Sequence, residues 1–172
     1  MRISTIFFFV THKPGGRTLD LVQETDLLRK IPMFAKLDSS KLKLLAFTSE
    51  ILTFEDNDIV FHLGDTADSA FVIMQGAIDI LMDTANGSVV SLTLKQNQLF
   101  GELALLNQAP RNATLRAQGQ IKVMRITADM FLKLLTENSD MALDVMRQLS
   151  DKLAKSHERV EMLQQQLNNQ VR

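Results

Sequence analysis

The spacing of apolar residues changes twice along the chain, and the middle part has the period of β-strands. Between residues 50 and 126, short apolar runs alternate with polar residues, as Ile78 and Ile80 alternate with Asp79. The dipeptide Asn86-Gly87 separates two such runs and is typical of a tight hairpin, because both residues tolerate a positive φ. Several short strands within about 75 residues predict an antiparallel barrel or jelly roll.

Helical spacing precedes this central part. Apolar residues between 19 and 28 recur as on one face of a helix, which has to end before Pro32. Asp38 or Ser39 can cap a second helix that starts there. We therefore expect two short helices ahead of the strands.

Helical spacing also follows the strands. Thr127 can cap a helix that continues through Leu135, and a second helix beginning at Asn138 or Ser139 can reach Gln170. That last helix would be about 48 Å long at 1.5 Å per residue, which is more than the roll needs for cover.

The long C-terminal helix carries a heptad pattern. Its seam positions alternate by three and four residues: Met146, Leu149, Leu153, Ser156, Val160, Leu163 and Leu167. Such a seam predicts a coiled-coil homodimer. The alternative is a helix whose apolar side lies against its own roll.

The most informative stretch for function runs from Phe100 to Ala117. A short helix opening at Gly101 and Glu102 would offer free backbone N–H groups to an anion, and Gly101 lets the backbone come close. The Glu102 carboxylate can accept hydrogen bonds from sugar hydroxyls, and Arg111 can grip a phosphate with two donors. Together these features suggest a nucleotide site, against the simpler interpretation of a turn and a solvated arginine.

These residues resemble the phosphate-binding cassette of cyclic nucleotide-binding domains. The matches are Phe100-Gly101-Glu102-Leu103-Ala104-Leu105 and Pro110-Arg111-Asn112-Ala113-Thr114, and we call residues 100–114 the cassette. A second stretch resembles the family's Gly-Asp hairpin, with Gly64-Asp65, Asp68, Phe71-Val72-Ile73 and Gly76 in order. The family includes the catabolite activator protein and the regulatory subunits of cyclic-AMP-dependent protein kinase. The resemblance covers roughly residues 27 to 167, and two motifs in the expected order are fairly specific.

This resemblance implies an α+β fold, an antiparallel β-roll of about eight strands with N-terminal helices and a long C-terminal helix. It implies a sensor that binds cyclic AMP, or cyclic GMP, as a regulatory ligand. Glu102 and Gly101 would hold the ribose 2′-hydroxyl and Arg111 the cyclic phosphate, with backbone N–H groups of Ala104 and Asn112. The full set of expected ligand-binding residues is Gly101, Glu102, Leu103, Ala104, Arg111, Asn112, Ala113, Ser156 and His157.

Two parts of this set depart from the family or stay open. Asn112 stands where the family usually has Ala, Ser or Thr, which leaves the base preference uncertain. Ser156 and His157 resemble the Thr-Ser pair with which the activator proteins' dimer helix reads adenine. The alternatives are a tolerated polar seam residue and a solvated histidine.

Composition limits the other classes of function. The net charge of −1 argues against a nucleic-acid partner, which calls for a basic surface. The chain has no cysteine, which is compatible with a reducing cytoplasm. His12, His62 and His157 lack metal-ligand spacing, so neither a metal site nor the alternative of a cupin-like jelly-roll enzyme is expected. We expect no enzyme.

We divide the chain into residues 1–18, an uncertain N-terminal segment; 19–138, the cyclic nucleotide-binding roll with its flanking helices; and 139–172, the dimerisation helix. The apolar run from Ile3 to Val10 is too short to span a membrane, and an extra strand, a partner-facing segment or an upstream translation start are all open. No helix-turn-helix follows the last helix, so we expect a sensor without a DNA-binding domain, acting on a downstream protein partner. The alternative is a ligand-independent dimerisation module of the same fold.

Overall fold

The structure is a computed structural model that describes residues 25–170, apart from residues 27 and 86. The N-terminal run from Ile3 to Val10 and most of the helix expected between 19 and 28 lie outside the described residues. Of that helix, Thr25, Asp26, Leu28 and Arg29 are described and are helical.

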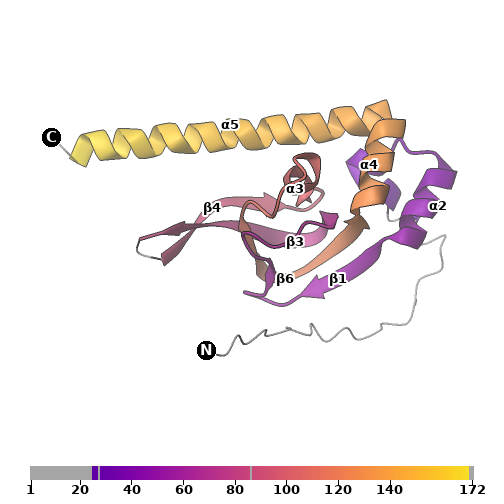
Figure 1. Cartoon of the computed structure of the whole chain (residues 1–172), viewed down its shortest axis with the longest axis horizontal. Helices are drawn as coiled ribbons and strands as arrows, with labels where there is room; N and C mark the ends of the chain where they lie inside the picture. The colour runs from indigo at the N-terminus through magenta and orange to yellow at the C-terminus, as the bar shows by residue number, and fades with distance from the viewer. Residues whose placement is uncertain (1–24, 27, 86, 171–172) are drawn as a thin grey trace.

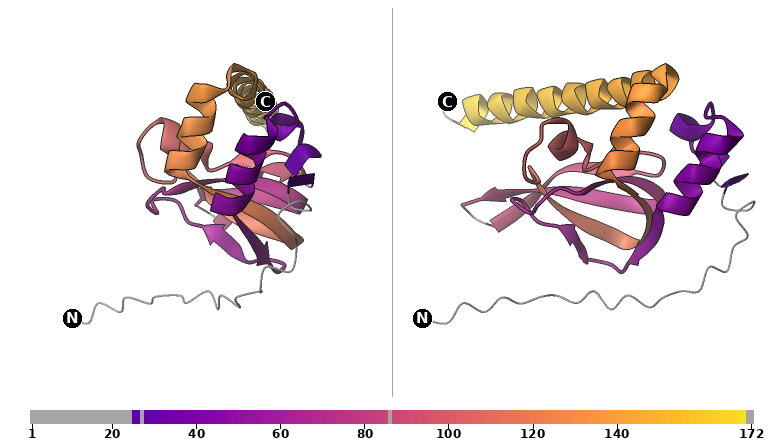
Figure 2. Two further views of the ribbon diagram at one scale, coloured as in Figure 1. Left: turned by 90° about the vertical axis from the view of Figure 1, so that its right-hand side faces the viewer. Right: turned by 45° about the vertical axis from the view of Figure 1, so that its right-hand side comes forward.

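A six-stranded antiparallel sheet curls into a roll (Figures 1 and 2). The strands are β1 (Glu50–Phe54), β2 (Ile59–Phe61), β3 (Ser69–Thr84), β4 (Gly87–Lys95), β5 (Leu99–Phe100) and β6 (Thr114–Thr127). The order is β1-β6-β3-β4, with β2 also paired to β6 and β5 to β3. The hairpin expected at Asn86-Gly87 joins β3 to β4, where Thr84 pairs with Gly87, while Asn86 itself lies outside the described residues.

The antiparallel roll is confirmed, but the described residues form six strands rather than about eight. The reason is that β3 and β6 are long, with 16 and 14 residues, and each pairs with several shorter strands. Their pairing shifts register between Ile73 and Ala77 without breaking. Gly76 has a φ of 87° there, and a Cβ would lie 2.9 Å from the Gln120 carbonyl oxygen. A bulge of this kind bends a strand and lets one strand serve both ends of the roll.

Helices close one side of the roll. They are the 3₁₀ turn η1 (Pro32–Phe34), α2 (Ser39–Thr48), α3 (Glu102–Leu106), α4 (Ala128–Glu137) and α5 (Ser139–Gln170). Asp38 caps α2 as expected, because its carboxylate accepts the Lys41 N–H at 2.9 Å. Thr127 is the residue before α4, although its side chain makes no capping hydrogen bond.

Two apolar cores share β3, because neighbouring side chains of a strand point to opposite faces. Phe71 and Ile73 fill the inside of the roll, whereas Ala70 and Val72 face the helices. The helical core also contains buried side chains of η1, α2, α4 and the start of α5: Met33, Phe34, Leu42, Leu45, Phe131, Leu134, Met141 and Val145. The roll and the first part of α5 therefore fold around a common core.

The long helix α5 lies alongside the roll, with α3 between it and the sheet (Figure 1). Leu149 is partly buried against the helical core, as the alternative of a helix lying on its own roll requires. The neighbouring seam residues, three positions before and four positions after Leu149, are exposed, 55% for Met146 and 72% for Leu153. The helix thus has one face that covers the roll and another that is apolar and open. In the part of the chain that the structure describes, neither α5 nor any other helix is both long and apolar enough to cross a membrane.

Candidate functional site

Gly101 sets the geometry of the cassette. It lies between β5 and α3 with a φ of 75°, a left-handed conformation that favours glycine. A Cβ on it would lie 2.7 Å from Arg111 Nη1 and 3.3 Å from the Phe71 ring. The absent side chain is therefore what allows the Arg111 guanidinium to approach this backbone.

Arg111 is buried inside the roll, with only 4% of the residue exposed. Its Nη1 donates to the Gly101 carbonyl at 2.8 Å and its Nη2 to the Ser69 carbonyl at 2.8 Å. The guanidinium carbon lies 4.3 Å from the centre of the Phe61 ring, which is close enough for a cation–π contact. Its Nε is buried and has no hydrogen-bond partner among the described residues.

The charge of Arg111 is only loosely balanced. The nearest carboxylate oxygen that pairs with it belongs to Asp68, 3.9 Å from Nη2, beyond hydrogen-bond distance. Burial lowers the pKa of Arg111, and Asp68 opposes that shift. A buried cation that is held by neutral carbonyls and a ring, and that keeps one free donor, can accept an anion.

Asp68 belongs to a polar network at the start of β3. It accepts a hydrogen bond from the Ser69 hydroxyl at 2.8 Å and pairs with Arg125 Nη2 at 2.7 Å. Burial raises the pKa of Asp68, but the Ser69 hydrogen bond and the charge of Arg125 outweigh it, so the pKa lies below its ordinary value. This network fixes Ser69, whose carbonyl in turn holds Arg111.

The two sequence motifs meet at the backbone of Arg111. The Arg111 N–H donates to the Asp65 carbonyl, and the Gly64 N–H donates to the Arg111 carbonyl, both at 2.8 Å. The Gly-Asp hairpin therefore fixes the backbone of the residue expected to hold the phosphate. Two segments that are 46 residues apart in the sequence form one site.

Glu102 is the first residue of α3 and is 1% exposed. Its partner is Lys152 of α5, whose Nζ lies 2.7 Å from Glu102 Oε1. Lys152 also donates to the Leu99 carbonyl at 2.5 Å. The carboxylate expected to hold the sugar is thus paired with a cation from another helix.

The remaining expected site residues differ in burial and lie on two elements, the cassette and α5. In the cassette, Ala104 is buried, Leu103 and Asn112 are exposed, and Ala113 is intermediate. On α5, Ser156 and His157 are exposed, and His157 Nε2 lies 3.3 Å from Glu161 Oε1. These two residues lie one turn beyond the α5 residue that contacts the cassette, and their role stays a prediction.

Lys152 is the functional candidate that sequence reasoning missed. The sequence does contain a signal for it. Gln148 and Lys152 are polar side chains four residues apart, and they lie on the same helix face as the buried Met141 and Val145. The pattern shows that a polar pair faces the roll, but it does not show what the pair contacts.

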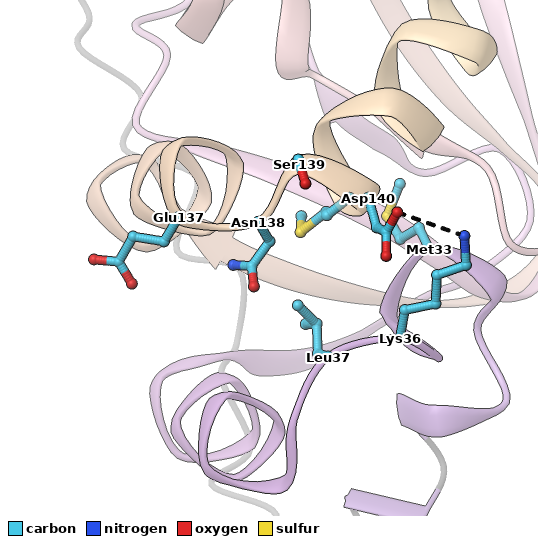
Figure 3. A pocket seen from close by; sticks show the side chains of 8 residues that line it. Met33, Lys36, Leu37, Glu137, Asn138, Ser139 and Asp140 are labelled. Atoms are coloured by element: carbon cyan, nitrogen blue, oxygen red, sulfur yellow. Dashed lines mark ion pairs between the residues drawn. The ribbon is translucent and has the colours of Figure 1, made fainter.

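A shallow pocket lies elsewhere, at the joint between α4 and α5 (Figure 3). Met33 and Leu37 line one side of it, and Lys36 reaches across to Asp140 at 3.8 Å. Its volume of about 190 Å³ is below the range of roughly 300–1,000 Å³ typical of small-molecule sites. It contains no cassette residue, so we do not take it as the functional site. Among the described residues no three His, Cys, Asp or Glu side chains gather as a metal site would require.

Comparisons with known proteins agree with this geometry. Residues 51–138 match the family model described as the cyclic nucleotide-binding domain, and the chain belongs to this family. The family membership, the β-roll and the cyclic nucleotide-binding domain predicted from the two motifs are thereby confirmed.

Individual relatives are regulatory proteins. The chain is 30% identical, over 115 residues, to a cAMP-dependent protein kinase regulatory subunit of Blastocladiella emersonii; this covers 66% of the chain and 28% of the relative. The chain therefore spans less than a third of the length of the curated relatives that it matches.

Two solved structures have the same fold. The regulatory domain of Toxoplasma gondii PKA with cAMP has a TM-score of 0.57 at 23% identity, over 66% of this chain and 43% of that one. The regulatory subunit of a cAMP-independent protein kinase A from Trypanosoma brucei has a TM-score of 0.66 at 18% identity, over 83% of this chain and 53% of that one.

Proposed function

We propose that this chain is a regulatory domain that binds a cyclic mononucleotide at the cassette, with cyclic AMP as its ligand, and that it has no catalytic role. The observation that carries the proposal is that the Arg111 guanidinium is bonded to the Gly101 carbonyl, directly before the Glu102 carboxylate, with both side chains buried. A buried cation beside a buried hydrogen-bond acceptor matches a ligand with one anionic phosphate and neighbouring hydroxyls.

In this proposal Arg111 pairs with the cyclic phosphate, to which it offers the free Nε donor. Glu102 accepts from the ribose 2′-hydroxyl, and Gly101 lets the ligand approach the backbone. The backbone N–H groups of Ala104 and Asn112 complete the phosphate contacts, and the Asn112 side chain influences the choice of base.

A panel of ligands tests the proposal on the full chain by thermal shift and calorimetry. A ligand at about 100 times its Kd stabilises a fold by about 2.7 kcal/mol, which corresponds to a Tm increase of roughly 5–10 °C for a chain of this size. We expect this shift with cyclic AMP, a smaller one with cyclic GMP and none with a cyclic dinucleotide, whose second base and phosphate do not fit one cassette. The absence of any shift with millimolar mononucleotide would refute a ligand-binding role.

A second candidate function is a ligand-independent interaction module. The observation in its favour is that both site side chains already have partners within the chain, Glu102 with Lys152 and Arg111 with two carbonyls. The solved Trypanosoma brucei structure that shares the fold is the regulatory subunit of a protein kinase A described as cAMP-independent. A flat response across the ligand panel, together with an intact dimer, would favour this candidate.

The open face of α5 supports a homodimer as part of the proposed function. Its seam residues are exposed large apolar side chains: Met146, Leu153, Val160 and Leu163. Met146, Leu153 and Val160 are each seven residues apart, as in one position of a heptad. A second copy of α5 would bury this row.

Sedimentation measurements test the dimer. We expect Leu153→Asp to give a monomer and the exposed off-seam control Lys155→Asp to leave the dimer intact. Ser156→Leu should strengthen the dimer, because a hydroxyl at a seam position weakens a coiled coil. A wild-type monomer at all concentrations would exclude this part of the proposal. The lack of cysteine also leads us to propose a cytoplasmic location.

A further inference from the structure

Two side chains of α5 bind the strand that leads into the cassette. The Leu99 N–H donates to Gln148 Oε1 at 2.9 Å, and Lys152 Nζ donates to the Leu99 carbonyl. Lys152 Nζ also pairs with Glu102 Oε1 at 2.7 Å. Both backbone groups of Leu99 and the Glu102 carboxylate are thus held by one face of α5, because Gln148 and Lys152 are one helical turn apart.

The Lys152–Glu102 pair is well shielded from solvent, with the Lys152 side chain 14% exposed and that of Glu102 1% exposed. A pair in such surroundings is strongly coupled, and removal of one partner leaves a buried charge uncompensated. Under the proposed function, the same carboxylate has to accept the ribose 2′-hydroxyl. The lysine and the sugar therefore need the same group.

We propose that Lys152 is an internal competitor of the ligand: its ammonium occupies the ribose-binding carboxylate Glu102, and the ligand has to exchange this ion pair for its own 2′-hydroxyl. This inference rests on the proposed function and adds to it the residue that sets affinity at the ribose end of the site. Glu102 is almost completely buried and Lys152 occupies its Oε1, so a hydroxyl that is to donate to this oxygen has to replace Lys152 there.

The exchange of the Lys152–Glu102 ion pair for the ligand's hydroxyl also changes how α5 is bound to the roll. Gln148 lies on the same face as Lys152, so a displacement of α5 that withdraws the lysine takes the partner of the Leu99 N–H with it. The ligand state of the cassette thereby determines how firmly α5 is held against the roll. By linkage, whatever fixes α5 elsewhere changes ligand affinity by the same factor.

The test compares Lys152 variants of the full chain by calorimetry with cyclic AMP and with 2′-deoxy cyclic AMP. A hydrogen bond to a charged group is worth about a factor of 10 or more, so we expect Lys152→Met to raise the affinity for cyclic AMP about 10-fold. The 2′-deoxy analogue lacks the hydroxyl that would bind Glu102, so it has no hydrogen bond to gain when Lys152 is removed. We therefore expect Lys152→Met to change its affinity by less than about twofold. The matched control is Lys155→Met, one turn along α5 on an exposed position, which should bind both ligands as the wild type does.

A second variant allows the test to be made if the Lys152→Met protein does not fold. Lys152→Gln removes the charge but retains a hydrogen-bond donor for the buried carboxylate, and we expect an intermediate gain that is again specific for the ribose hydroxyl. A wild-type measurement is independent of all variants: hydrogen exchange of the Leu99 amide should speed up about 10-fold when cyclic AMP saturates the site, because Gln148 leaves it.

The outcomes separate this inference from the proposed function. If the wild type binds cyclic AMP but Lys152→Met and Lys152→Gln bind with unchanged or weaker affinity, or gain equally for both ligands, the competitor role is wrong and the ligand site stands. Unchanged protection of the Leu99 amide in the saturated wild type would also overturn it. If neither the wild type nor any variant binds a mononucleotide, the proposed function is wrong, and this inference, which rests on it, is wrong as well.

Discussion

Arg111 and Glu102 lie at two ends of the same cassette, but their partners come from different parts of the molecule. Arg111 is held from within the roll, by the carbonyls of Gly101 and Ser69 and by the Phe61 ring. Glu102 is held from outside the roll, by Lys152 of α5. The phosphate end of the site is therefore built by the sheet itself, whereas the state of the ribose end depends on a helix.

This difference indicates which end of the site can couple ligand binding to the position of α5. Phe61 belongs to the core inside the roll, while Ser69 begins β3 and Gly101 directly follows β5, so the partners of Arg111 are fixed by the packed sheet. Glu102 depends on a single side chain of a helix whose opposite face is exposed. The ribose end is thus the place where the contents of the cassette and the position of α5 can influence each other.

The largest effect should come from the loss of one half of the Lys152–Glu102 pair. We expect Lys152→Met to lower the free energy of unfolding of the ligand-free protein by about 3–5 kcal/mol, because a buried carboxylate loses its counter-charge. Urea denaturation measures this, and Glu102→Gln in the same protein should recover at least half of the loss. If the double variant is as unstable as the single one, the two residues are not coupled.

Next in size is the loss of Arg111. Its removal leaves the part-buried Gly101 carbonyl and the buried Ser69 carbonyl without their donors, and we expect Arg111→Ala to cost about 2–3 kcal/mol of stability. Ligand affinity should fall about 10- to 150-fold, and Arg111→Lys should restore only part of it, since lysine lacks the planar fork. Arg147→Ala, on the exposed face of α5, is the control. Undiminished affinity of Arg111→Ala in calorimetry would mean that the phosphate end lies elsewhere.

A smaller effect is expected from Gly101→Ala. The left-handed backbone costs an alanine about 1–2 kcal/mol of stability. Its Cβ would also displace the Arg111 guanidinium from the Gly101 carbonyl. Gly119→Ala is a matched control, because Gly119 has a φ of 70° and no atom beyond its own residue and its two chain neighbours lies within 4 Å of the place that its Cβ would take. Both variants should lose stability, but Gly101→Ala alone should lose ligand affinity. Equal affinities in the two variants would show that Arg111 adapts to the added methyl group.

The smallest effect concerns Asp68, which supports the phosphate end through Ser69. Its pKa in the folded protein lies below the ordinary value of 3.8, so its contribution to stability is complete above that value and is lost as the pH falls through the folded pKa. Because the side chain is largely exposed, we expect Asp68→Asn to cost less than about 1 kcal/mol at pH 7. Denaturation at pH 7 and at a pH of about 2.5 should show the wild-type advantage shrinking with acid. An advantage that grows with acid would contradict the sign, and Asp151→Asn on exposed α5 serves as the control.

The sequence by itself determined the family, the roll and the residues of the cassette. These features are local: the Gly-Asp hairpin was predicted from its resemblance to a family motif, and the cap at Asp38 and the glycine at position 101 follow from the short-range chemistry of those residue types. The spacing of apolar residues also placed the limits of α5, because its periodicity continues without a helix breaker from Ser139 to Gln170.

The tertiary structure alone decided which groups meet at the ribose end. Lys152 and Glu102 are 50 residues apart, and their contact depends on the angle at which α5 crosses the cassette, which no local pattern encodes. The same crossing turned Leu149 toward the core and left Met146 and Leu153 exposed, although the heptad pattern treats all three alike. The number of strands was also set by tertiary contacts, because β3 and β6 stay continuous only where bulges let them bend around a shared core.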